Sequence, residues 1–216
     1  MLFRSRYAVQ GGDWGAYVAG RIAFDQPEAV AGFHTNAPGL LPIPGDLEDL
    51  SEEEVQFAQA AQRSQLTQGY HQIVHGLAPD SIGVGLTDSP AALAAWLVPR
   101  YRLWSDCAED LESRFSKRDL CDLLTFYWAT GTAASSLRLY AATRQDRWRL
   151  APGERITVPT AACDFPGELV RPPRAWTARI CADIRSWTEM PRGGHFAAWE
   201  EPELLSEDLI GFLRGL

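Results

Sequence analysis

Apolar and polar positions first alternate in a way that favours a strand, a helix and a second strand. Residues 6–10 form a short apolar run. Apolar positions between Trp14 and Phe24 then recur near helical spacing, and Pro27 follows where that helix should end. A second apolar run covers about Val30–Asn36. This order of elements is typical of a parallel α/β sheet.

The middle of the chain has a different pattern. Prolines and glycines punctuate residues 38–45, and residues from about 47 to 148 are helical in pattern without a convincing strand. Ser51 followed by Glu54 is a helix-capping pair, and Pro90 suits a first helical turn. A segment this long is far beyond an ordinary loop. We therefore predict a helical lid at 46–150, inserted between two core segments.

Strand patterns return after the helical segment. Ile156 and Val158 alternate with polar residues within 154–161, and a second apolar run spans about 180–187. A closing helix beginning near Pro202 places apolar residues on one face. We predict an α/β protein in which residues 1–45 and 151–216 form a discontinuous core with a partial parallel sheet.

Composition narrows the function classes. The chain has 216 residues, of which 46% are hydrophobic and 22% charged, with a net charge of -8. An acidic chain without a basic cluster argues against nucleic acid and against an anionic membrane surface as partners. No apolar run approaches the ~20 residues of a membrane span. The first residues carry no hydrophobic stretch typical of a signal peptide.

The cysteines point to a reducing compartment. They form no Cys-x-x-Cys pair, and no histidine accompanies them at metal-ligand spacing. We expect reduced, mostly buried thiols, no metal and a cytoplasmic protein. The four positions are Cys107, Cys121, Cys163 and Cys181.

One motif suggests nucleophilic chemistry. Gly11-Gly-Asp-Trp-Gly15 lies between the first strand and the first helix, where α/β hydrolases place a nucleophile elbow, Gly-x-nucleophile-x-Gly. The elbow presents the nucleophile beside a helix N-terminus, which stabilises negative charge. Here the nucleophile position holds Asp13 instead of serine. The alternative is that Asp13 merely caps the helix in a glycine-rich turn.

A base and an acid follow the elbow in the order that this fold uses. His195 lies in Arg192-Gly-Gly-His-Phe196, between the last strand and the last helix. Glu168 follows the strand that ends near Ala161, and Asp164 is a nearby competitor. The order nucleophile, acid, base matches that of α/β hydrolases, whereas a lone histidine is more often a satisfied polar residue.

Three segments carry a closer resemblance. The elbow, the segment from Arg192 to Leu205 and the segment Tyr127–Tyr140 are similar to the epoxide hydrolases of the microsomal and juvenile-hormone type. The resemblance covers nearly the whole chain. It implies an α/β-hydrolase fold with Asp13 as nucleophile, His195 as base and Glu168 as the acid that orients the base.

The same resemblance assigns two lid tyrosines. Tyr70 and Tyr140 match the residues that bind and protonate the epoxide oxygen in that family. The alternative is that each is an amphipathic side chain on a lid helix. The backbone N–H of Trp14 is a natural oxyanion donor. No cofactor is implied.

The chemistry of the nucleophile fits this family. A serine that attacked an epoxide would form an ether, which water does not readily cleave. A carboxylate forms an ester, and His195 activates water to hydrolyse it. The expected activity is conversion of an epoxide to a vicinal diol, on a hydrophobic small molecule. A homodimer is left open.

The chain departs from the family pattern ahead of the elbow. The family builds several more strands there, together with a His-Gly-x-Pro loop that supplies a second oxyanion donor, and the sequence contains neither. We therefore expect a chain that lacks part of the family's sheet, exposes a strand edge and is a poor enzyme by itself.

Other functions remain open at this point. A haloalkane dehalogenase shares the aspartate nucleophile and the ester, and Trp14 fits a halide-binding role. An ordinary esterase is disfavoured because Asp13 stands in the serine position. An inactive remnant of an epoxide hydrolase, with a triad retained by descent, is the alternative from a different class.

Overall fold

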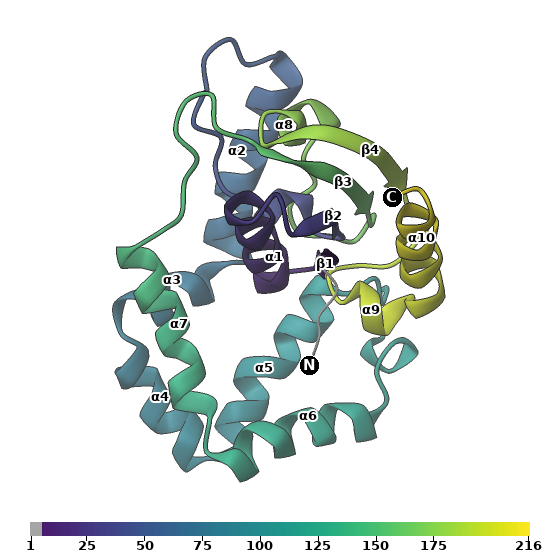
Figure 1. Ribbon diagram of the computed structural model, residues 1–216. Helices are drawn as coiled ribbons and strands as arrows, with labels where there is room; N and C mark the ends of the chain where they lie inside the picture. Colours follow the sequence, from purple (N-terminus) through teal and green to yellow (C-terminus); the bar gives the residue numbers. More distant parts are fainter. Residues whose placement is uncertain (1–5) are drawn as a thin grey trace. The chain divides into compact units, whose positions relative to one another are not determined.

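The computed structural model describes residues 6–216 and divides the chain into two compact units. The sheet unit contains the residues up to Ala61 together with Arg149–Leu216. The helical unit is Gln62–Trp148. Figure 1 labels the elements of both units.

The sheet unit is built on four parallel strands in the order β1-β2-β3-β4. The central strands β2 and β3 are buried along almost their whole length, as expected for a parallel sheet covered on both faces. The predicted α/β class and the four predicted strands are confirmed. The strands are β1 Tyr7–Gly11, β2 Val30–Thr35, β3 Ile156–Asp164 and β4 Cys181–Glu189.

Helices α1 (Trp14–Asp25) and α10 (Pro202–Arg214) cover opposite faces of this sheet (Figure 1). Side chains alternate between the two faces along a strand. In β2, the Phe33 side chain packs against α1. A Cβ atom added to Gly20 of α1 would lie 3.7 Å from the Phe33 ring. The next residue, His34, bonds to Asp208 of α10. Small buried residues on α1 allow this close packing.

Short helices complete the sheet unit. An apolar cluster lies beneath the loops that follow β3 and β4, and it includes Phe165, Met190 and Leu205. This cluster anchors the carboxyl ends of those strands. The short elements are η1 Pro38–Leu40, α8 Arg174–Ala178 and α9 Ala197–Glu200.

The helical unit contains no strand within the part of the chain described. Its core joins α4, α5 and α7 through residues that include Leu86, Leu93 and Leu137. Ser89 caps α5 by accepting from the Ala92 N–H, with Pro90 in the first turn as predicted. The elements are α3 Tyr70–Leu77, α4 Pro79–Asp88, α5 Pro90–Trp104, η2 Leu111–Ser113, α6 Lys117–Thr130 and α7 Ala133–Gln145.

Among the described residues, no single helix combines the length and the apolar character that a membrane span requires. Helices α4 and α5, which are bent by 115° relative to each other, meet this requirement only when they are taken together, and only by length and composition.

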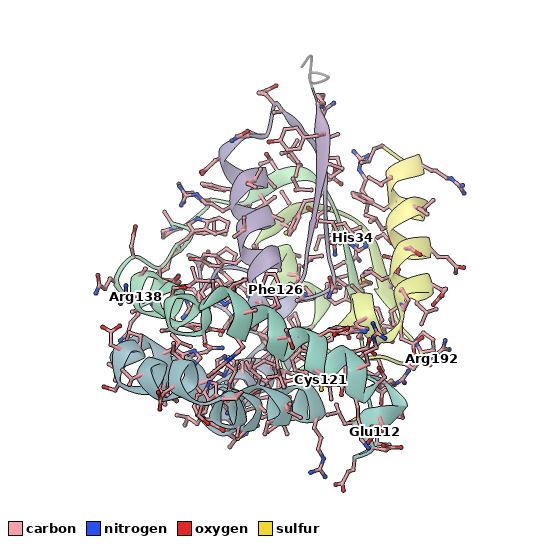
Figure 2. The ribbon with its side chains drawn as sticks, turned by 90° about the horizontal axis from the view of Figure 1, so that it is seen from below. His34, Glu112, Cys121, Phe126, Arg138 and Arg192 are labelled. Atoms are coloured by element: carbon pink, nitrogen blue, oxygen red, sulfur yellow. The ribbon has the colours of Figure 1, made fainter. Side chains whose placement is uncertain are left out.

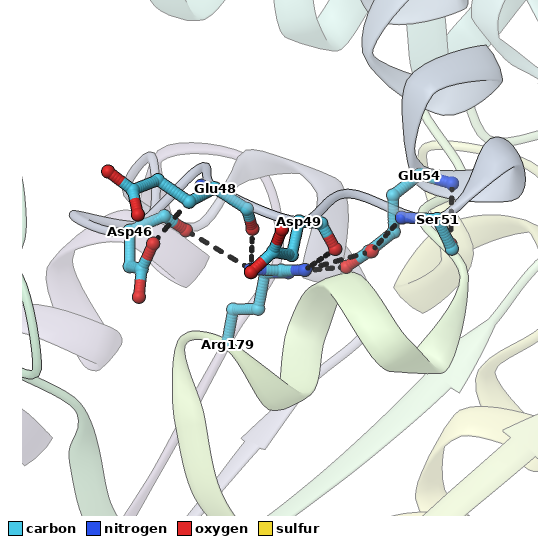
Figure 3. A network of polar contacts seen from close by, with 6 residues as sticks. All are labelled: Asp46, Glu48, Asp49, Ser51, Glu54 and Arg179. Carbon is cyan, nitrogen blue, oxygen red and sulfur yellow. Dashed lines mark hydrogen bonds and ion pairs between the residues drawn. The ribbon is translucent and has the colours of Figure 1, made fainter.

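One arginine holds the segment before α2 (Glu52–Thr67) against the sheet unit (Figure 3). The Arg179 guanidinium donates to the backbone carbonyls of Asp46, Glu48 and Asp49 and to the carboxylate of Glu54. Residues 46–61 therefore group with the sheet unit, although the sequence pattern started the insertion at 46. The predicted capping pair is present, because Ser51 and Glu54 bond to each other's backbone N–H.

We expect Glu54→Gln to lower the free energy of unfolding by about 2–3 kcal/mol, because it removes a charge-assisted bond to Arg179. The bond to Arg179 lowers the pKa of Glu54 from 4.5 to about 2. A depressed carboxylate pKa stabilises the fold above the unfolded value. The difference between wild type and variant should thus be full above pH 4.5 and shrink as the pH falls towards 2.

Urea denaturation across this pH range measures the effect. The exposed neighbour Glu53→Gln is the matched control and should change stability little. If the loss in free energy of unfolding caused by Glu54→Gln did not depend on pH, it would not arise from the ion pair between Glu54 and Arg179.

Candidate active site

The turn after β1 places Asp13 in an uncommon backbone conformation. Asp13 has φ 48° and ψ -129°, a positive φ that costs a non-glycine residue about 1–3 kcal/mol. A Cβ on Gly11 would lie 2.1 Å from the Gly15 carbonyl carbon, so the turn requires glycine there. The Asp13 side chain is 56% exposed and lies at the N-terminus of α1. This is the geometry of a nucleophile elbow.

His195 lies between two carboxylates. Its Nδ1 is 2.9 Å from Oε1 and 3.1 Å from Oε2 of Glu168. Its Nε2 is 3.9 Å from Oδ2 of Asp13. Glu168 and His195 are both buried. The Glu168 carboxylate favours the proton on Nδ1 and directs Nε2 towards Asp13.

The loops that carry Glu168 and His195 are bonded to each other. The Gly167 N–H donates to the Gly193 carbonyl at 2.9 Å. Gly193 has φ 103°, and a Cβ there would lie 2.7 Å from the Phe165 ring, so glycine is required. These contacts fix the position of His195 relative to Glu168.

A second pair of contacts holds the His195 loop from the other side. Arg192 forms an ion pair with the buried Glu201 at 2.8 Å. The Phe196 N–H donates to the Glu200 carboxylate at 3.0 Å. Apart from the presence of adjacent acids, no pattern in the sequence indicated these roles.

Asp164, the competing acid, is engaged elsewhere. The Nε of Arg171 donates to both of its carboxylate oxygens, at 3.0 and 2.9 Å. The carboxylate bonded to His195 in this structure is therefore that of Glu168.

The two carboxylates change the acidity of His195. Burial by itself lowers the pKa of His195, but the bond to Glu168 and the nearby carboxylates of Asp13 and Glu168 outweigh it and raise the pKa to about 10. The raised pKa favours the second proton on the ring at neutral pH. Loss of the Asp13 charge would remove one of these causes and lower the pKa again.

This shift predicts a pH-dependent contribution to stability. A histidine pKa raised above the ordinary 6.5 stabilises the fold fully below 6.5, and this stabilisation is lost as the pH rises towards about 10. We expect the difference in free energy of unfolding between wild type and His195→Gln to shrink over that range. Urea denaturation at a series of pH values measures it, and a constant difference would contradict the assignment.

The remaining predicted site residues fall in different parts of the chain. Trp14 is the first residue of α1, so its backbone N–H belongs to the helix N-terminus beside Asp13. Tyr70 begins α3 and Tyr140 lies in α7, both in the helical unit. Within that unit, both tyrosines neighbour one aromatic cluster, in which Tyr140 contacts His75 and Tyr70 contacts Trp96.

A second polar group in the sheet unit was not found from the sequence. His34 lies between the sheet and α10 (Figure 2), with its Nε2 2.9 Å from an Asp208 carboxylate oxygen. Thr188 donates to the other oxygen of Asp208. Cys163 completes a set of possible metal ligands whose atoms lie within 4.8 Å of one another. However, burial raises the Cys163 thiol pKa, and both oxygens of Asp208 are engaged, so the group links α10 to the sheet.

Comparison with known proteins defines the class. No family model matches the chain. Juvenile hormone epoxide hydrolase from Bombyx mori superimposes with a TM-score of 0.82 at 26% identity, over 98% of this chain and 55% of that one. Aspergillus niger epoxide hydrolase gives a TM-score of 0.75 at 27% identity, over 98% and 52%. The fold is that of the α/β-hydrolase superfamily.

Relatives that are similar in sequence indicate a narrower class of protein than the fold does. Epoxide hydrolase 1 of Oryctolagus cuniculus is 33% identical over 230 residues, covering 96% of this chain and 50% of that protein. A Stigmatella aurantiaca protein named for the same activity is 36% identical over 213 residues, covering 98% and 48%. The chain spans about half the length of these relatives. Over nearly its whole length, the chain is similar to proteins that are named epoxide hydrolases.

Proposed function

We propose that this chain carries the catalytic residues of an epoxide hydrolase, which converts a hydrophobic epoxide to a vicinal diol. The observation that supports this most is His195, bonded to Glu168 through one ring nitrogen and facing Asp13 through the other. An aspartate in the elbow forms an ester that water can cleave, and this two-step chemistry needs such a base.

In the first step, an Asp13 carboxylate oxygen attacks an epoxide carbon. The ring C–O bond breaks, its electron pair stays on the epoxide oxygen, and that oxygen takes a proton from Tyr70 or Tyr140. The product is a monoester of the diol on Asp13. The lid role of the helical unit belongs to this proposal, because both tyrosines lie in it.

In the second step, His195 takes a proton from water, which attacks the ester carbonyl. Esterification removes the negative charge of Asp13 and with it one cause of the raised pKa of His195. The ring then gives up a proton, which returns to the tyrosinate left by the first step, and becomes available as a base. The Trp14 N–H stabilises the oxyanion. Collapse releases the diol and restores the Asp13 carboxylate.

The partner in this proposal is a hydrophobic small-molecule epoxide, and no cofactor takes part. We place the protein in the cytoplasm, on the expectation from its reduced cysteines. All four cysteines are free.

Turnover of an aryl epoxide by the purified chain tests the proposal, with the diol as the measured product. Haloalkane dehalogenation is the second candidate, because it uses the same nucleophile and ester. Chloride release from a haloalkane without diol formation from the epoxide would favour the dehalogenase. Neither product from a folded chain would favour the inactive remnant.

A further inference from the structure

Arg100 of α5 is a buried cation, because the residue is only 7% exposed. Among residues 6–216, no carboxylate forms an ion pair with Arg100, and no group forms a hydrogen bond with its Nε. Burial of a charge is costly unless something compensates it. The compensation must come from the groups around the guanidinium.

Those groups are aromatic faces. The central guanidinium carbon lies 4.0 Å from the centre of the Tyr70 ring. It lies 5.5 Å from the Trp96 ring and 6.0 Å from the Trp104 ring. These distances are in the range of cation–π attraction, which strengthens when water is excluded. Tyr70 is the nearest of the three rings, so it bears the strongest contact.

The neighbouring histidine adds no positive charge at neutral pH. The Trp96 Nε1–H donates to His75 Nε2 at 3.0 Å, so that nitrogen acts as an acceptor. Burial first, and then the charge of Arg100, lower the pKa of His75 to about 4. The positive charge next to the Tyr70 ring is therefore that of Arg100.

We propose that Arg100 is a positioning residue for Tyr70, which holds the ring in place and stabilises the negative charge left when the hydroxyl gives up its proton. The inference rests on the proposed function, in which a lid tyrosine protonates the opened epoxide. A guanidinium against the ring face attracts a phenolate more strongly than a neutral phenol, because the charge is delocalised over the ring. Arg100 thus assists proton transfer without touching the substrate.

Nitration by tetranitromethane tests this contact without turnover, because the reagent attacks the phenolate form of tyrosine. We expect Arg100→Met to lower the nitration rate at Tyr70 about threefold to tenfold, the range of a partly buried cation–π contact. Arg100→Lys keeps the charge and should retain most of the rate. Peptide mass spectrometry assigns the nitrated residue. Tyr7, 43% exposed compared with 38% for Tyr70, is the internal control and should not change.

The direction of the change in the nitration rate of Tyr70 distinguishes an effect of the Arg100 charge from an effect of packing. If Arg100 only filled space, its loss would expose the Tyr70 ring and raise the nitration rate, which would overturn the proposal. An unchanged rate in a folded variant, checked by circular dichroism, would overturn it too. Arg100→Gln is a second neutral variant if Arg100→Met does not fold.

A double-mutant cycle connects the contact to the reaction. If Arg100 acts through the Tyr70 hydroxyl, Arg100→Met should slow ester formation in the wild-type background and have little further effect in Tyr70→Phe. Equal effects in both backgrounds would refute the inference while leaving the proposed function intact. A Tyr70→Phe variant with unchanged ester formation would instead remove Tyr70 from the proposed function, whereas nitration reports on the contact in either case.

Discussion

Replacement of His195 by Gln is expected to stop turnover with the substrate still attached to Asp13. Attack by the carboxylate does not require the histidine, whereas hydrolysis of the ester does. Steady-state turnover should fall by at least about 10³-fold, as for other catalytic bases that act in a triad. Intact-protein mass spectrometry after addition of an aryl epoxide should show a species heavier by one substrate molecule.

The position of the adduct decides the role of Asp13. Peptide mapping should place it on the segment that contains Asp13, and the double variant Asp13→Ala, His195→Gln should show no adduct. An adduct on another residue would refute the assignment. Full activity of Asp13→Ala alone would refute the proposed mechanism altogether.

Glu168→Gln is expected to slow ester hydrolysis by about 10²–10⁴-fold, and ester formation much less, because it removes the charge that orients and strengthens the base. In the structure this carboxylate lies 2.9 Å from His195 Nδ1. Single-turnover kinetics separates the two steps.

Asp164→Asn is the matched control for this prediction. Asp164 is the last residue of β3, four positions before Glu168, but its carboxylate is bonded to Arg171. We expect a stability loss from this variant and little change in the hydrolysis step. A larger kinetic effect from Asp164→Asn than from Glu168→Gln would reverse the assignment.

Local patterns in the sequence were sufficient to predict the strands and helices of the sheet unit and some of the hydrogen bonds that cap the helices. The strand–helix–strand order of the opening segment follows from apolar spacing and from the glycine pair after β1. The capping bonds of Ser51 and Glu54 were predictable because both partners lie within one helical turn. Asp13 could be predicted as a candidate nucleophile because the glycines that the turn requires lie next to it in the sequence.

Tertiary structure decided the choices that depend on residues far apart in the chain. Asp164 and Glu168 both come after the strand that the sequence predicts to end near Ala161, and the sequence offered no physical means to choose between them. The choice depends on Arg171 binding one carboxylate and on the loop of Gly193 bringing His195 to the other.

The same reason explains the start of the helical insertion and the partner of Tyr70. Glycines, prolines and polar residues at 38–54 indicate a break in the pattern, but Arg179, more than a hundred residues later, binds that segment to the sheet unit. Arg100 and Tyr70 are thirty positions apart, and neither residue type alone predicts their stacking. Local patterns determine elements because backbone bonding and capping are short-range, whereas the pairing of buried charges depends on where distant segments meet.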